Sequence, residues 1–342
     1  MVSSAETFRS GWMQRAARTV ARSRGRVAAS LVLASALAQA LPAQQPGLPP
    51  QQPGLSPQQP GLSPQQPGLS PQQPAAAAVA AQGPGLMPHG DVAQGNIGAG
   101  DAVASAAGTH PLEPALQVAQ KGLAAIRANI RDYSATVVKR ERIDGKLGEH
   151  EYMFAKIRQQ PFSVYLYFLG PDSVKGQEVI YVDGVNDGNM LAHAGSGVRA
   201  MVGTVSLKPQ SMLAMAGNRY PITELGVENL TRRLLEVAEH DKQFGECDVN
   251  FYPNAKVNGR ICTCIQVTHP VPRRNFRFHL ARVFIDDELT IPIRYEAYDW
   301  PQQAGGQPVL MEEYTYMNVK INNGFTDADF DPRNTAYKFG MK

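Results

Sequence analysis

Three cysteines are the residues of this chain with the clearest capacity for covalent chemistry. Cys262 and Cys264 are two residues apart, so they share one face of a strand. Cys247 falls on the strand expected before it. Pairing residue 254 with 259 would place Cys247 opposite Gln266, with Cys264 diagonal to it and Cys262 further away. In an exported protein a cross-strand disulfide is the usual outcome. We therefore predict a disulfide from Cys247 to Cys264, or to Cys262 if the register differs by two residues.

Two other kinds of chemistry use neighbouring residues. The three cysteines and His269 could form a zinc site, but no C-x-x-C spacing supports one. His269, His279 and Glu296 could act as an acid-base group, yet nothing in the pattern places them on one face. No nucleophile, metalloprotease, phosphate-loop or dinucleotide motif occurs. The sequence predicts neither an enzyme nor a bound metal or cofactor.

The stretch from Glu149 to Gly184 has the strongest pattern in the chain. It predicts three successive strands, interrupted at Gln160-Pro161 and at Gly170-Pro171, and closed by a turn at Asp183-Gly184. The middle strand, Phe162 to Leu169, is apolar on both faces. Such a strand must be covered on two sides, by a helix, a second sheet or a bound apolar ligand.

One face of these strands is the candidate binding site for an apolar ligand. Methionine is flexible and suits a pocket that accepts varied acyl chains. The predicted lining residues are Phe162, Val164, Leu166, Phe168, Val179, Tyr181 and Met190, with Met153, Met201 and Met212 as further candidates. The alternative is that the same side chains pack on the domain's own helices, because strand alternation cannot distinguish a filled core from a cavity.

The remaining elements define the domain, residues 110–342. An amphipathic helix is predicted from Leu112 to Ile130, then a strand from Tyr133 to Ile143. Short strands are predicted at 189–194 and 198–207, and helices at 211–216 and 226–241. The chain then returns to strands at 247–252, 260–268, 276–285, 291–298 and 311–321. This order favours an α+β fold with a strongly curved antiparallel sheet.

The N-terminus, residues 1–40, has the features of an export signal. Six arginines precede a short apolar run from Val27 to Leu37, and Ala38-Gln39-Ala40 offers a small-x-small cleavage pattern. The apolar run is shorter than the roughly 20 residues that cross a bilayer. We predict an exported protein of the periplasm or cell envelope that does not span the membrane.

Net charge argues against nucleic-acid binding. The whole chain has a formal charge of +3, with 33 basic and 30 acidic side chains. Without the six arginines and one glutamate of the signal, 27 basic and 29 acidic side chains remain. The folded part is slightly acidic and lacks the basic surface that nucleic acid requires.

A spacer, residues 41–109, joins the signal to the domain. The unit QQPGLSP repeats with a period of seven between Gln44 and Pro74. Its prolines and glycine disfavour helices and sheets, and one leucine per unit cannot build a core. We predict a disordered, extended tether.

Three features in this order resemble a known superfamily. They are the break at Gln160-Pro161-Phe162, the strand that ends in Val182-Asp183-Gly184, and the late strand that leads into the segment from Asn318 to Pro332. The pattern resembles the lipoprotein-carrier superfamily of LolA, LolB and RseB type. Residues 112–339 are more similar to an uncharacterised family of exported bacterial proteins, domain-of-unknown-function family 1571. The resemblance implies an incomplete antiparallel barrel wrapped around helices, with an apolar cavity.

The sequence therefore predicts a non-enzymatic, exported domain that binds a lipid, a lipoprotein or another apolar ligand on the concave face of a half-barrel. An envelope protein is a further possible partner. The alternative is a structural or protein-interaction module whose barrel is filled by its own side chains, and an enzyme on this scaffold is the third interpretation.

We expect deletion of the residues before Leu41 to leave the protein in the cytoplasm, because the targeting information lies there. Cell fractionation followed by immunoblotting measures this. A full-length protein that keeps its N-terminus and stays with membranes after an alkaline wash would instead indicate a retained anchor.

Overall fold

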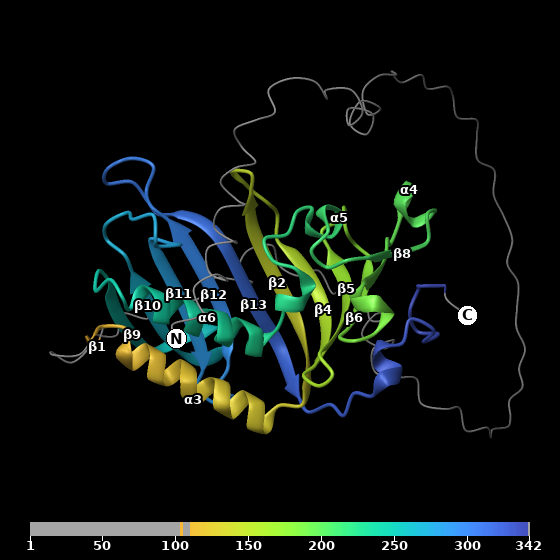
Figure 1. Ribbon diagram of the computed structural model, residues 1–342, viewed down its shortest axis with the longest axis horizontal. Coiled ribbons are helices and arrows are strands. Elements are labelled where there is room, and N and C mark those ends of the chain that lie inside the picture. Colours follow the sequence, from red (N-terminus) through yellow and green to blue (C-terminus); the bar gives the residue numbers. More distant parts are fainter. Residues whose placement is uncertain (1–102, 105–109, 341–342) are drawn as a thin grey trace, which may run out of the picture. The chain divides into compact units, whose positions relative to one another are not determined.

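A computed structural model describes residues 103–104 and 110–340 (Figure 1). These residues belong to one compact unit within Ser70–Lys342. The predicted signal peptide lies outside the described residues, as does all of the predicted spacer except Val103–Ala104, which form strand β1.

An antiparallel sheet with the strand order β1-β9-β10-β11-β12-β13-β2-β4-β5-β6-β7-β8 forms the body of the domain, and β3 pairs with β2 beside it. Among the described residues β1 and β8 are the two edges, so the sheet is open. The strands in the first half of the domain are β2 (Asp132–Ile143), β3 (Lys146–Leu147), β4 (Glu151–Arg158), β5 (Ser163–Gly170), β6 (Glu178–Val182), β7 (Met190–His193) and β8 (Thr204–Leu207). The later strands are β9 (Asp248–Val257), β10 (Arg260–Thr268), β11 (Leu280–Asp286), β12 (Pro292–Asp299) and β13 (Val309–Ile321). The predicted α+β fold with an open, curved antiparallel sheet is confirmed.

Two long helices lie against one face of the sheet, here called the concave face (Figure 1). They are α3 (Glu113–Asn129) and α6 (Val227–Asp241). Ile126 of α3 and Val227 of α6 are buried in the same apolar cluster as strand residues from β2 to β12. Both helices were predicted from their apolar periodicity, and both predictions are confirmed.

The start of α6 is attached to the middle of the sheet. The Tyr133 hydroxyl accepts a hydrogen bond from the Val227 amide at 2.9 Å, and the Tyr316 hydroxyl accepts one from the Gly226 amide at 3.1 Å. Gly226 has φ 111°, and a Cβ atom there would lie 2.9 Å from the Tyr133 hydroxyl oxygen. Only glycine permits this close approach.

Between β7 and α6 the chain forms only short elements: α4 (Gly197–Ala200), β8, α5 (Met212–Met215) and the 3₁₀ turn η2 (Ile222–Glu224). The predicted strand at 198–207 is therefore correct only in its second half. Similarly, β11 begins at Leu280, four residues later than predicted. Phe276 instead stacks on the His269 ring at a centroid distance of 3.9 Å. Phe276 and Phe278 are both buried although they lie in a loop. Their alternation with polar residues therefore resembles that of a strand.

The opposite, convex face is covered near β4 to β7 by the C-terminal segment, which includes the 3₁₀ turn η3 (Asp327–Phe330). The buried residues of this second cluster are Tyr165, Ile180, Leu191, Phe330, Tyr337 and Phe339. The Lys156 ammonium donates to Asp329 at 2.8 Å and to the Tyr337 hydroxyl at 3.1 Å. Strand β5 is thus covered on both faces, as its doubly apolar sequence predicts.

The predicted disulfide is wrong for this structure, in which Cys247, Cys262 and Cys264 are free, buried thiols. Val257 pairs with Arg260 across a tight turn. Cys262 then lies opposite Ala255 and, after a bulge, Cys264 lies opposite Tyr252. Cys247 lies five residues before Tyr252, about 16 Å along the chain. Disulfides require Cα atoms within about 7 Å. The predicted register was wrong because the turn comprises two residues, Asn258-Gly259, both with positive φ, rather than the four that pairing residue 254 with 259 implies.

Labelling the unreduced, denatured domain should therefore modify all three cysteines. The folded domain should react slowly, because burial raises the pKa of Cys262 and Cys264 to about 12 and that of Cys247 to about 11. Mass spectrometry after alkylation counts the modified thiols. A single modified cysteine together with a cross-linked peptide would contradict this pairing of the strands.

Candidate functional site

The predicted apolar site lies on the concave face of β4 to β7. Leu166 pairs with Val179, Val164 with Tyr181, and Phe168 with Met153. Because alternate residues of a strand share a face, these side chains form one continuous surface toward the helices.

The structure places the predicted lining residues in the main apolar cluster. Val164 is fully buried, and the exposed fractions of Leu166, Phe168 and Met190 are 7–8%. The cluster members among the predicted residues are Met153, Val164, Leu166, Phe168, Val179, Tyr181 and Met190, with Phe162 packed against them. Met201 and Met212, by contrast, are 86% and 92% exposed and do not line this surface.

Residues 211–225, here called the cover segment, contribute to the same cluster. The segment contains α5 and η2 and runs from β8 to the start of α6 in front of the sheet (Figure 1). Its side chains packed on the cluster are Ala214, Ile222 and Leu225. Two large side chains of α5 face outward: Met212 is 92% exposed and Leu213 is 66% exposed.

Polar contacts anchor the middle of the cover segment to the sheet. The Arg219 guanidinium donates to Glu312 of β13 at 2.6 Å, and the Tyr220 hydroxyl donates to the same carboxylate at 3.0 Å. Lys139 of β2 donates to the Asn218 side chain. Burial raises the pKa of Glu312, and the Arg219 charge only partly opposes this effect.

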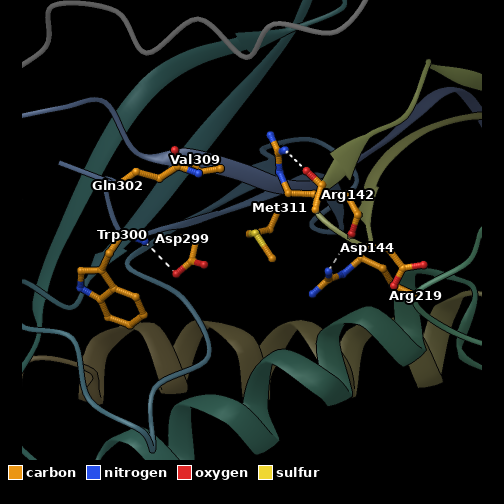
Figure 2. Close-up of a pocket in the computed structure, with 9 residues that line it drawn as sticks. Arg142, Asp144, Arg219, Asp299, Trp300, Gln302, Val309 and Met311 are labelled. Atoms are coloured by element: carbon orange, nitrogen blue, oxygen red, sulfur yellow. Dashed lines mark hydrogen bonds between the residues drawn. The ribbon is translucent and has the colours of Figure 1, made fainter. Parts of the chain in front are cut away.

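Two cavities lie on the rim of the sheet beside this anchor. One of about 350 Å³ is lined by residues that include Arg142, Arg219, Asp299 and Trp300 (Figure 2). The other, of about 290 Å³, includes Lys139, Glu151, Pro171 and Gly217 in its wall. None of the predicted lining residues belongs to either cavity, so the rim is a separate region from the apolar face.

Sequence reasoning did not identify Arg219, Tyr220 or Glu312. The sequence contained one signal for this anchor, the carboxylate of Glu312 within an apolar and aromatic strand. A charge that faces inward requires a partner, so Glu312 indicated that a polar contact would form there. Its partners lie 92 and 93 residues away in the sequence, and no local pattern identifies them.

The candidate acid-base group is not brought together. The His269 ring donates from Nδ1 to the Phe278 carbonyl oxygen at 3.1 Å and faces Asp241 at 3.4 Å, while Glu296 forms ion pairs with Arg282 and Arg294. His279 contacts the His269 carbonyl oxygen. In residues 103–104 and 110–340 no group of three or more histidine, cysteine or acidic side chains is arranged to hold a metal ion.

None of the helices described for residues 110–340 combines the length and the apolar character needed to cross a bilayer.

Several solved structures are similar to this chain at low sequence identity. A putative outer membrane lipoprotein-sorting protein domain from Vibrio parahaemolyticus is 14% identical, covering 63% of this chain and 95% of that chain, with a TM-score of 0.31. The lipoprotein LppX of Mycobacterium tuberculosis is 15% identical, covering 64% and 100%, with a TM-score of 0.37. The MucA/MucB complex of Pseudomonas aeruginosa is 16% identical, covering 64% and 60%, with a TM-score of 0.35.

Sequence comparison gives a definite family. No curated protein matches the chain, but the model of a family described as "Protein of unknown function (DUF1571)" matches residues 130–339. That match runs from the end of α3 to the C-terminal segment and includes the concave face, the cover segment and the rim cavities. The chain therefore belongs to the DUF1571 family.

Proposed function

We propose that this domain is a non-enzymatic, exported binding protein that holds a lipid, a lipoprotein acyl chain or another apolar molecule on its concave face. The observation that carries the proposal is that the cover segment places only a few apolar side chains over β4 to β7. The sheet contributes a continuous apolar surface there, while the cover segment contributes Ala214, Ile222 and Leu225. An apolar ligand would replace these three side chains.

The energy of such an exchange favours a long apolar ligand. Exposing a buried aliphatic side chain costs about 1.5–3 kcal/mol, and burying a methylene group stabilises by about 0.8 kcal/mol. An acyl chain of ten or more carbons would thus compensate for displacing the cover segment. The outward-facing Met212 and Leu213 are apolar side chains on the same segment, available to contact the ligand once the segment moves.

The anchor of the cover segment is compatible with such a movement. Arg219 and Tyr220 contact Glu312 at the rim, and the side chain of Arg219 is 29% exposed. Its partner Glu312 is only 5% exposed, so this contact would hold Arg219 at the rim while Ala214 and Ile222, on either side of it, are displaced. The helices α3 and α6 pack on each other and need not move.

The test compares two leucines of similar burial on opposite faces of the sheet. Leu166 lies on the concave face and is 7% exposed, and Leu191 lies under the C-terminal segment and is 9% exposed. Leu166→Ala and Leu191→Ala should each lower the free energy of unfolding by about 2–5 kcal/mol. Only Leu166→Ala should weaken binding of a fluorescent fatty-acid probe, by about tenfold or more, because it removes contacts worth at least 1.4 kcal/mol.

A parent protein that binds no apolar probe would contradict the proposal. That result would favour the alternative function, an interaction module whose concave face is filled by its own side chains. Equal loss of probe binding in both variants would mean that destabilisation, and not the concave face, accounts for the effect.

A further inference from the structure

The 350 Å³ rim cavity has two chemically different walls (Figure 2). Arg142 and Arg219 stand on one side, and Asp299 and Trp300 on the other. Met311 lies between them and provides an apolar floor. Strand order explains the separation: Asp299 ends β12, Met311 belongs to β13 and Arg142 belongs to β2. Neighbouring strands are about 4.8 Å apart, so the two walls rise from backbones about 10 Å apart.

The cationic wall is held in place by backbone contacts. Arg142 donates from Nε to the Leu310 carbonyl and from Nη1 to the Gly145 carbonyl, both at 2.8 Å. Arg219 donates from Nη1 to the Arg142 carbonyl at 3.2 Å as well as from Nε to Glu312. Nη2 of each arginine makes no hydrogen bond with residues of the described part of the chain. Two fixed guanidinium groups with free N–H donors are suited to a phosphate group.

The opposite wall is suited to a cation. The Asp299 carboxylate is exposed, accepts a hydrogen bond from the Trp300 amide at 2.8 Å and forms no ion pair within residues 110–340. The Trp300 ring is fixed by a hydrogen bond from Nε1 to the His269 carbonyl at 3.2 Å. A carboxylate beside an indole ring attracts an ammonium group through both its charge and the cation–π interaction.

The charge balance of the cavity selects for a zwitterion over a simple anion. Asp144 also lines the cavity, on the same side as the two arginines, while Asp299 lies on the opposite side (Figure 2). A ligand that carries only negative charge would meet the field of both carboxylates, whereas one with a charge of each sign can match both walls.

The cavity also connects to the apolar face. Arg219 belongs to the cover segment, three residues before Ile222, which packs on the concave-face cluster. A ligand whose polar end lies between Arg219 and Trp300 would have its apolar end beside the surface that the cover segment protects.

We propose that this rim cavity binds a phosphate–ammonium zwitterion, such as a phosphoethanolamine or phosphocholine group, with the phosphate on Arg142 and Arg219 and the ammonium on Asp299 and Trp300. If the zwitterion is the headgroup of a lipid, this proposal rests on the proposed function of the concave face. If it is a soluble phosphoamine, the proposal is independent of that function.

Trp300 provides the measurement. The chain contains two tryptophans, so Trp12→Phe in the full-length protein leaves Trp300 as the only indole. We expect lysophosphatidylethanolamine to shift its fluorescence and to bind about three- to tenfold more tightly than lysophosphatidic acid with the same acyl chain, as a cation–π contact and an exposed carboxylate together predict. Asp299→Asn keeps the acceptor for the Trp300 amide, and should bring this ratio close to one. Asp187→Asn, which removes a carboxylate remote from the cavity, should leave the ratio unchanged.

The outcomes separate the two proposals. If no acyl ligand binds but phosphoethanolamine alone shifts Trp300 fluorescence and loses affinity in Asp299→Asn, the concave-face proposal fails and the site belongs to a soluble phosphoamine. If acyl ligands bind with no preference for the ammonium group, and phosphoethanolamine has no effect, the concave-face proposal survives and the zwitterion site is overturned. A preference that persists in Asp299→Asn overturns it equally.

Discussion

Two tyrosine hydroxyls determine where the helix layer meets the sheet. Tyr133 and Tyr316, on adjacent strands, accept the amides of Val227 and Gly226, which are donors that a helix start leaves without an intrahelical partner. Burial is the main cause that raises the pKa of Tyr316, to about 12, and that of Tyr133 well above its ordinary value. Both hydroxyls therefore stay neutral at physiological pH. The contact fixes one end of α6 and, with it, the end of the cover segment.

The two faces of the sheet are stabilised by different means. Under the C-terminal segment, polar contacts to Lys156 and Glu178 accompany the apolar cluster. On β11 to β13, Arg294 is 2% exposed and forms ion pairs with Glu296 and Glu313. Removing one partner of such a buried pair leaves an uncompensated charge, which costs about 3–5 kcal/mol. The concave face of β4 to β7 is instead covered by residues 211–225, which contribute three partly buried apolar side chains. A ligand is expected to displace part of the protein where the local stability is low.

Sequence patterns predicted the elements that depend on local chemistry. The doubly apolar β5 indicated cover on both faces, and the structure supplies the helices and cover segment on one side and the C-terminal segment on the other. The apolar periodicity of α3 and α6 was also sufficient to predict both helices. The register of β9 and β10 was not predictable from spacing, since the bulge between Cys262 and Cys264 changes it midway. The Arg219–Glu312 anchor and the rim cavity depend on segments brought together by the sheet, and no local pattern contains that information. Whether the predicted lining residues hold a ligand is a question of occupancy that alternation cannot answer.

If the concave face binds an apolar ligand, the protein should carry that ligand when it is purified. The full-length protein, purified from an envelope extract without detergent, would be analysed by native mass spectrometry and by mass spectrometry of its organic extract. We expect an amphiphile in about one-to-one ratio with the protein, lost in Leu166→Ala and retained in Leu191→Ala. A protein that carries no amphiphile, and acquires none when incubated with envelope lipids, would contradict it.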